Sequence, residues 1–335
     1  MALSSSKESK KSLGAIEADR DSGALATLCK AASDSLRLDI MRVLRSDSFG
    51  VQELAAIFAM PQPGMSHHLK ILSKAGLLAT RRQGNSIFYR HELIREESEF
   101  ADFLLALHKA IADLPLRPEY AARIEKIYVG RSSQSRLYFE KHVDQFEENQ
   151  GMLCELDQYW PNLREILDLT KLSRESRVME VGPGQGALLK ELSKRYRSIV
   201  ALDNSGRMLA FTKAQLAGED RIQFIKDSLE DLDTKVLGES LDAVVLNMVL
   251  HHMSSPQQAM QKIRQLLSSG GFLIIADLCS HNQEWAKSSL GDVWLGFDPE
   301  DLKTWAQAAG FHEEQSLYLG LKNGFQIQLK LFRAL

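Results

Sequence analysis

Hydrophobic residues change their spacing about half way along the chain. From Ala24 to about Pro115 they recur every three to four residues, as in amphipathic helices, with one strand-like interruption near residue 80. Strand-like runs then alternate with amphipathic segments at Arg177–Val181, Ser198–Asp203, Ile222–Ile225, Leu241–Leu246 and Phe272–Ala276. Strands separated by helices predict a mainly parallel sheet with helices on both faces.

The same pattern divides the chain into four expected parts. Residues 1–22 are polar and are expected to form a mobile tail, residues 23–115 a mostly helical domain, and residues 174–335 the α/β domain. Residues 116–173 are expected to form a connector. Its helical patches, Leu137–Glu148 and Met152–Leu169, lie around the polar stretch Gly130–Ser135. The expected fold class is therefore α/β overall, with a mostly α N-terminal domain.

Within the N-terminal part, residues 51–72 predict a helix-turn-helix. A first short helix carries Leu54 and Ile57 on one side, Pro61 ends it, and Pro63 suits the first turn of the next helix. The second helix buries an apolar face around Leu69 and presents a polar face outward. The outward side chains, which we expect to contact DNA, are Gln62, Ser66, His67 and Lys70.

A basic hairpin is predicted directly after these two helices. Two β-prone runs flank the polar turn Arg81–Asn85, in which Gly and Asn favour a tight connection. Residues 61–91 contain five Lys and Arg and no Asp or Glu, in a chain whose formal net charge is −3. We expect Arg81, Arg82 and Asn85 to contact phosphates or the minor groove. The alternative is a small helical domain that uses these elements only for packing.

Residues 36–89 resemble the ArsR/SmtB family of winged helix-turn-helix regulators. The resemblance lies in Met-Ser-His-His-Leu-Lys-Ile-Leu, at residues 65–72, and in the Ala-Gly-Leu-Leu that follows. It implies a homodimer whose seam is formed by helices near residues 24–32 and 92–112. Two recognition helices would then read a palindromic operator in double-stranded DNA.

One departure from that family concerns metals. Metal-sensing members carry a cysteine pair in the first helix of the motif, where this chain has Phe49–Ala55 without a cysteine. His91 and His108 leave a seam metal site as a minor option, because no convincing partner is spaced with them. We therefore expect no metal.

Glycines and acids mark a ligand site in the C-terminal part. Gly182, Gly184 and Gly186 follow a strand and let the backbone pass close to a ligand. Asp203 ends the next strand, where an acid can accept both hydroxyls of a ribose. Asp227 ends the third strand and can accept from an adenine amine. These positions fall at the carboxyl ends of strands, where open α/β sheets bind ligands.

This ordered set resembles the Rossmann-like class I S-adenosylmethionine-dependent methyltransferases, over about residues 131–332. The resemblance is carried by Glu-Val-Gly-x-Gly-x-Gly, Asp-x-Ser-x-x-Met-Leu and Val-Leu-His-His-Met. It implies S-adenosylmethionine or S-adenosylhomocysteine as ligand, with residues 137–146 as a lid. The implied binding residues are Glu180, Gly182, Gly184, Gly186, Asp203, Asn204, Met208, Asp227, Ser228 and Asn247.

Two functions remain open. The first is a DNA-binding regulator, a repressor, that senses S-adenosylmethionine or its product. The second is an active methyltransferase for a small-molecule acceptor, with an attached regulatory domain. His251 or His252 could serve as a general base. Arsenite methylation is disfavoured, because this domain offers only Cys154 and Cys279 as thiolates.

Composition narrows the setting. The 335 residues, 44% hydrophobic and 25% charged, suit a globular protein of two or three domains. No apolar run approaches the ~20 residues of a membrane helix, and the Ser/Lys-rich start lacks the apolar segment of a secretory signal. The three cysteines form no CxxC pair. We therefore expect a cytoplasmic protein with no membrane partner and no disulfide framework.

Overall fold

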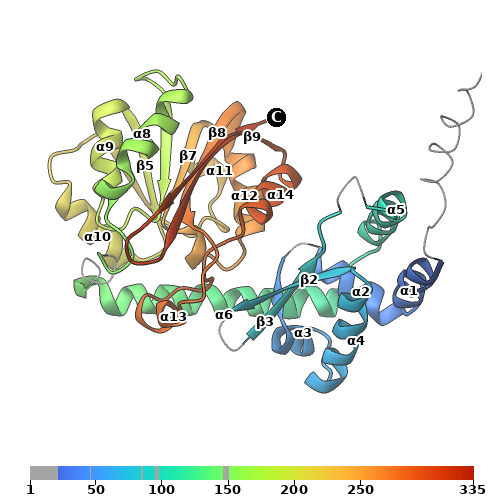
Figure 1. Ribbon diagram of the computed structural model, residues 1–335. Helices are drawn as coiled ribbons and strands as arrows, with labels where there is room; N and C mark the ends of the chain where they lie inside the picture. The colour runs from blue at the N-terminus through green and yellow to red at the C-terminus, as the bar shows by residue number, and fades with distance from the viewer. Residues whose placement is uncertain (1–21, 46, 84–85, 95–97, 146–150) are drawn as a thin grey trace, which may run out of the picture. The chain divides into compact units, whose positions relative to one another are not determined.

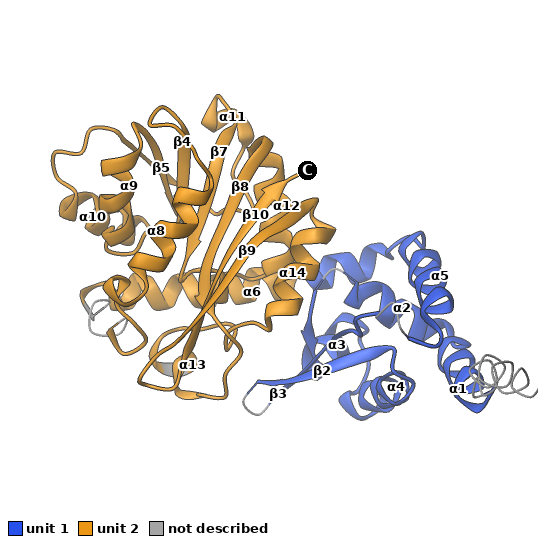
Figure 2. Cartoon of the chain, turned by 45° about the horizontal axis from the view of Figure 1, so that its top comes forward, with its two compact units in different colours: residues 1–124 blue, residues 125–335 orange. Residues whose placement is uncertain are grey.

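The computed structural model describes residues 22–335 except 46, 84–85, 95–97 and 146–150 (Figure 1). The chain divides into two compact units, residues 1–124 and 125–335 (Figure 2). Helix α6 (Pro118–His142) contains the boundary between them. No helix among the described residues is both long enough and apolar enough to cross a bilayer.

The first unit has its helices around a small sheet. Its elements are α1 (Ser22–Ala32), α2 (Ser35–Leu44), β1 (Phe49–Gly50), α3 (Val51–Ile57), α4 (Gln62–Lys74), β2 (Leu78–Gln83), β3 (Ser86–His91) and α5 (Ala101–Ala112). The Asp34 side chain starts α2 by accepting from the Arg37 amide at 3.0 Å. The strands pair antiparallel in the order β1-β3-β2.

Helices α3 and α4 form the predicted helix-turn-helix. Leu54 and Ile57 of α3 and Leu69 of α4 are fully buried, as their spacing predicted. Pro63 lies in the first turn of α4, where its missing N–H costs no hydrogen bond. Strands β2 and β3 then form the predicted hairpin, with Gln83 paired to Ser86.

The second unit contains the large sheet. Along the chain, α6 is followed by η1 (Val143–Gln145), η2 (Leu156–Gln158) and α8 (Trp160–Leu169) before the first strand of that sheet. The parallel part has β4 (Arg177–Val181), α9 (Ala187–Arg195), β5 (Ser198–Asp203), α10 (Gly206–Gln215), β6 (Ile222–Lys226), α11 (Thr234–Leu237), β7 (Leu241–Asn247), η3 (Leu250–His252), α12 (Pro256–Leu266) and β8 (Leu267–Leu278). The chain ends with α13 (Trp285–Ser289), α14 (Pro299–Ala308), β9 (Phe311–Gly320) and β10 (Gln326–Ala334).

The described residues build a seven-stranded sheet in the order β6-β5-β4-β7-β8-β10-β9. The first five strands are parallel, and β10 joins them antiparallel to both β8 and β9. Val178, Ala243 and Ile274 share one core with α8 and α9. Their neighbours Met179 and Leu273 are buried on the opposite face, on which α12 and α14 pack (Figure 1). The doubly wound α/β fold is thus confirmed.

Three local expectations were wrong. The polar stretch Gly130–Ser135 lies inside α6, where Arg131 is buried, so tertiary contacts override weak helix propensity. The pair Gly270–Gly271, just before the expected strand Phe272–Ala276, predicts a turn, but both residues lie inside β8, with Gly270 at a φ of 74° beside a register shift. The helix expected near residues 92–112 is shorter than that. Helix α5 begins at Ala101, and the described residues between Glu92 and Ala101 are not helical.

Candidate functional site

One pocket lies at the carboxyl ends of β4, β5, β6 and β7. This is the edge of a parallel sheet at which α/β proteins bind ligands. Its lining contains seven of the ten residues expected to bind the nucleoside ligand: Gly182, Gly184, Asp203, Asn204, Met208, Asp227 and Ser228. The fold therefore brings together residues that are up to about fifty positions apart in the chain.

The other three expected residues lie outside the lining. Glu180 is buried in β4, and this burial raises the pKa of its carboxyl well above the usual value. Gly186 caps the start of α9 with a φ of 83°. The Asn247 side chain accepts a hydrogen bond from the Tyr159 hydroxyl at 2.9 Å.

Gly182 shows why the loop after β4 contains glycine. Its φ is 64°, and a Cβ there would lie 2.3 Å from Val249 Cγ2. Its amide donates to the Leu202 carbonyl at 2.8 Å, which ties the loop to β5. Any side chain at this position would strain the backbone and push Val249 toward the pocket.

Asp203 places a carboxyl group in the pocket wall at the end of β5. Its Oδ1 accepts from the Ser205 amide at 2.7 Å, which fixes the orientation of the side chain. Burial raises the pKa of Asp203 to about 6, against the lowering effect of that hydrogen bond. The group is therefore ionised at neutral pH and able to accept hydroxyl hydrogen bonds.

Helix α6 contributes aromatic side chains to the same pocket. Tyr138, Phe139 and His142 line it, and all three fall in the segment expected to form a lid. The Phe139 ring contacts the His252 ring edge-on, with centroids 4.7 Å apart. A Cβ on Gly291 would lie 2.4 Å from the Tyr138 ring, so the chain packs tightly there. This side of the pocket is suited to an apolar or aromatic molecule.

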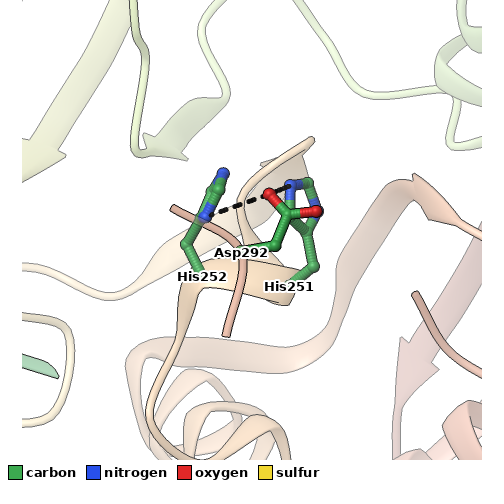
Figure 3. Close-up of side chains that lie close together, drawn as sticks. All are labelled: His251, His252 and Asp292. Carbon is green, nitrogen blue, oxygen red and sulfur yellow. Dashed lines mark ion pairs between the residues drawn. The ribbon is translucent and has the colours of Figure 1, made fainter. Parts of the chain in front are cut away.

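Two histidines and two acids meet at the border of the pocket. His251 and His252 lie in η3 and line the pocket, and Asp292 comes from the segment after α13. Figure 3 shows the Asp292 carboxylate between the two imidazole rings. Its Oδ1 lies 3.8 Å from His251 Nε2 and 3.8 Å from His252 Nδ1. On the other side of His251, Nδ1 lies 2.7 Å from Asp277 Oδ1.

The pKa values of this cluster are strongly perturbed. Burial lowers the pKa of His251, but the carboxylates of Asp277 and Asp292 outweigh it and raise the value to about 9. Burial and the neighbouring His251 hold the pKa of His252 well below its usual value. Burial raises the pKa of Asp292 to about 6. Perturbed groups that line a pocket are typical of functional sites.

Sequence reasoning singled out the two histidines but missed Asp277 and Asp292. Asp277 is the last residue but one of β8, so its position near the carboxyl edge of the sheet was a usable signal. Asp292 lies in a segment without a motif, far along the chain from the histidines. Only the tertiary fold places it beside them.

The cysteines of this unit are poor candidates for thiolate chemistry. Cys154 and Cys279 are both buried. Burial raises the pKa of Cys154 to about 12 and the pKa of Cys279 to about 11. Both groups are therefore protonated thiols at neutral pH.

The first unit presents most of the side chains expected to contact DNA. On α4, Gln62, His67 and Lys70 are exposed and Ser66 is half-buried. On β2, Arg82 is exposed and Arg81 is half-buried. Asn85 lies outside the described residues. The exposed polar face of α4 is opposite its buried apolar face, as a recognition helix requires.

His91 and His108 lie together in this unit, with ring centroids 4.5 Å apart. His91 Nε2 lies 2.7 Å from the Met41 carbonyl, so this nitrogen carries the proton and donates. Burial lowers the pKa of His91 to about 4. Within the described part of the chain, neither belongs to a group of three or more side chains able to hold a metal ion.

The two units match different protein families. Residues 32–81 match the family described as helix-turn-helix domain. Residues 179–275 match the family described as methyltransferase domain. These matches lie over α3 and α4 in the first unit and over the parallel strands in the second.

The chain is also similar to individual proteins whose names identify them as methyltransferases. The chain is 26% identical over 176 residues to demethylmenaquinone methyltransferase of Clavibacter sepedonicus, covering 43% of this chain and 70% of that protein. It is 27% identical over 99 residues to ribosomal RNA small subunit methyltransferase A of Geobacillus kaustophilus, covering 28% and 34%. The N-methyltransferase NodS of Bradyrhizobium japonicum, solved with S-adenosyl-L-homocysteine, is 17% identical with a TM-score of 0.44, covering 56% and 97%.

Proposed function

The chain joins a helix-turn-helix domain to a methyltransferase domain, and we propose that it binds S-adenosylmethionine and methylates a small molecule. The observation that supports this most is the composition of one pocket. Glycines and acids suited to a nucleoside line one side, and aromatic rings with a histidine pair line the other. A domain that only binds the nucleoside would not need the aromatic rings and the histidine pair.

The pocket residues fit the proposed cofactor. When bound, S-adenosylmethionine supplies a methyl group at its sulfonium and leaves as S-adenosylhomocysteine. Asp203, Asp227 and Ser228 line the pocket. In this proposal the Asp203 carboxylate accepts the ribose hydroxyls, and Asp227 and Ser228 contact the adenine edge. In this proposal the turn at Gly182, which has no room for a side chain, lets the backbone approach the methionine portion. Residues Asn204 and Met208 complete this wall.

The acceptor side indicates a small and partly apolar molecule. Phe139, Met253 and Leu290 provide apolar surface, and Tyr138 and His252 add polar atoms. Holding an acceptor in line with the methyl group supplies most of the catalysis that such a transfer needs. The name of the Clavibacter relative makes quinols of naphthoquinone type the first acceptors to test.

Calorimetry of the full-length protein tests the cofactor step. We expect S-adenosylmethionine and S-adenosylhomocysteine each to bind once per chain. The variant Asp203→Asn should bind either ligand about 10- to 100-fold more weakly, because hydrogen bonds to a charged acceptor contribute roughly 1.5–3 kcal/mol. The exposed Asp220→Asn is the matched control and should bind as the wild type does. Equal affinities in all three proteins would contradict the site.

We also propose that the helix-turn-helix unit makes the chain a DNA-binding regulator. The exposed face of α4 and the basic strand β2 support this role. In this proposal a homodimer reads a palindromic site in double-stranded DNA, as a repressor, and the nucleoside ligand changes its DNA affinity. The two roles are compatible, because a methyltransferase binds both its cofactor and its product, and its occupancy by each depends on the ratio of their concentrations.

A further inference from the structure

The side chains of His251, His252 and Asp292 form a cluster in which three possible metal-ligand atoms lie close together. One nitrogen of each histidine and one carboxylate oxygen all lie within 4.8 Å of one another. Among the described residues, this is the group of three or more such side chains that could hold a metal ion. It lies at the border of the pocket and includes the lining residues His251 and His252.

Backbone hydrogen bonds hold the two halves of this cluster together. The amides of Val293 and Trp294 donate to the His251 carbonyl at 3.1 and 3.0 Å. The Trp294 indole N–H donates to the Met253 carbonyl at 2.8 Å. Asp292 is therefore fixed against η3 by its own neighbours, and the geometry does not depend on contact between the side chains.

The facing atoms of Asp292 and His251 lack hydrogen-bond partners, whereas His252 Nδ1 lies 3.3 Å from the Gly291 carbonyl. Asp292 is only 3% exposed, yet neither of its oxygens accepts a hydrogen bond from a described residue. His251 Nε2 is also buried without a hydrogen-bond partner. Leaving such groups unsatisfied is costly, so each one needs an explanation.

The separation of these atoms suits a bridging ion. Asp292 Oδ1 lies 3.8 Å from a nitrogen of each histidine, which is too far for a direct hydrogen bond. With bonds of about 2.1 Å, two ligands of one ion lie roughly 3–3.4 Å apart. Closing the site around an ion therefore requires each of these two carboxylate–histidine distances to shorten by less than about 1 Å.

Asp277 supplies the expected support behind the cluster. Histidines that bind metals usually direct their other ring nitrogen to a carboxylate, which fixes the tautomer and the ring. Here Asp277 contacts His251 Nδ1 at 2.7 Å and is itself held by the amides of Leu250 and Leu278 at 3.0 and 2.7 Å. This arrangement leaves Nε2 directed toward Asp292, where a bound ion would displace the Nε2 proton.

We infer that His251, His252 and Asp292 bind one divalent first-row transition cation beside the cofactor pocket. Two imidazoles, one carboxylate and no thiolate suit ions such as Zn²⁺, Co²⁺, Fe²⁺ or Mn²⁺ and leave coordination positions open. His252 faces the pocket, so the open positions are accessible to an acceptor. Resting on the proposed methyltransferase function, the ion would hold an acceptor through an oxygen, such as a hydroxyl whose proton passes to water.

Cobalt binding to the full-length, tag-free protein tests this inference. After treatment with a chelator and its removal, Co²⁺ is titrated while its visible absorption is recorded. We expect one ion per chain, with a spectrum typical of nitrogen and oxygen ligands. The variants Asp292→Asn and His252→Gln should bind Co²⁺ at least about 100-fold more weakly. Asp277→Asn should weaken binding about 10- to 100-fold while keeping the spectrum.

The exposed His312→Gln variant is the matched control, because it removes a histidine far along the chain from the cluster. It should bind Co²⁺ as the wild type does. Absence of a stoichiometric wild-type site, or the same titration in Asp292→Asn, would overturn the inference. If a variant fails to fold by circular dichroism, the wild-type stoichiometry and the His252→Gln titration still decide it.

Calorimetry with S-adenosylhomocysteine separates this inference from the proposed function. A protein that binds the nucleoside but no cobalt would retain the proposed function and lose the metal site. A protein that binds one Co²⁺ per chain but neither nucleoside would retain the metal site and lose the proposed function.

Discussion

At the residue scale, Asp203 belongs to the motif predicted from the sequence and lines the pocket. The side chain ends β5, its orientation is fixed by the Ser205 amide, and it is enclosed enough that burial raises its pKa to about 6. A carboxyl group with this pKa changes charge within an accessible pH range. Its ability to accept two ribose hydroxyls changes with that charge, because a protonated carboxyl has fewer acceptor sites.

We therefore predict that nucleoside affinity falls as the pH is lowered through about 6. Only the ionised Asp203 accepts both hydroxyls, and its ionised fraction is nearly complete at pH 7.5. Lowering the pH from 7.5 to 5.5 should raise the Kd of S-adenosylhomocysteine about fourfold. Calorimetry at the two pH values, with the same ionic strength, measures the change.

The Asp203→Asn variant provides the control for this pH dependence. Its affinity should be low at both pH values and should change little between them, because the amide does not titrate. An equally steep loss of affinity in this variant would assign the pH dependence to another group. Circular dichroism at both pH values shows whether the fold is kept.

At the element scale, α4 and the β2–β3 hairpin carry polar side chains that the sequence predicted to contact DNA. Helix α4 buries Met65, Leu69 and Leu72 and exposes polar side chains on its other face. Strand β2 adds Arg82 on an exposed position. A helix that enters the major groove and a basic strand that contacts phosphates would together read a duplex.

We predict that Arg82→Ala weakens DNA binding and flattens its salt dependence. Each phosphate contact contributes about 0.9 to the slope of log K against log salt, so this slope should fall in magnitude by about one. Fluorescence anisotropy with duplex from upstream of the gene, at several salt concentrations, measures the slope. The exposed Lys322→Ala, in the second unit, is the control. An unchanged slope in Arg82→Ala would remove the hairpin from the DNA interface.

Strands β9 and β10 are among the elements that the sequence pattern did not predict. Strand β10 carries Lys330, which is 2% exposed and bonds Glu313 at 2.6 Å. A lysine in a strand usually indicates an exposed face, and here the ion pair permits burial instead. Because the lysine interrupts the apolar run, the sequence pattern did not predict this interior strand, which lies next to the edge strand β9.

At the scale of the whole molecule, the proposed regulation requires ligand binding in one unit to be coupled to DNA binding in the other. A ligand shifts DNA affinity only if it binds the DNA-bound and DNA-free forms with different affinity. Coupling of about 1–3 kcal/mol, common in allosteric proteins, corresponds to a change of roughly 5- to 150-fold.

We predict that saturating S-adenosylmethionine or S-adenosylhomocysteine changes the DNA Kd at least about fivefold. Anisotropy at fixed salt, with each nucleoside titrated separately, identifies the signal. The Asp203→Asn variant should bind DNA normally without nucleoside and should not respond to either ligand at these concentrations. The same DNA Kd with and without both ligands would leave a methyltransferase whose DNA-binding unit acts independently.

The sequence by itself determined the local elements and the order of the motifs. Strands Arg177–Val181 and Ser198–Asp203 begin and end at the predicted residues, because buried parallel strands carry largely apolar runs bounded by glycine or polar residues. The helix-turn-helix was equally readable from its prolines and apolar spacing. These features depend on short-range interactions, which a local pattern records.

Only the tertiary structure decided which side chains meet. Asp203 and Asp227 were predictable as pocket residues, because the carboxyl ends of parallel strands share one edge. Asp292 was not, because its place beside His251 depends on a loop held by backbone hydrogen bonds that no residue pattern encodes. Burial likewise sets the pKa of Asp203, since desolvation arises from the surrounding fold. The sequence thus placed the chemical groups along the chain, and long-range packing determined their neighbours and their charge.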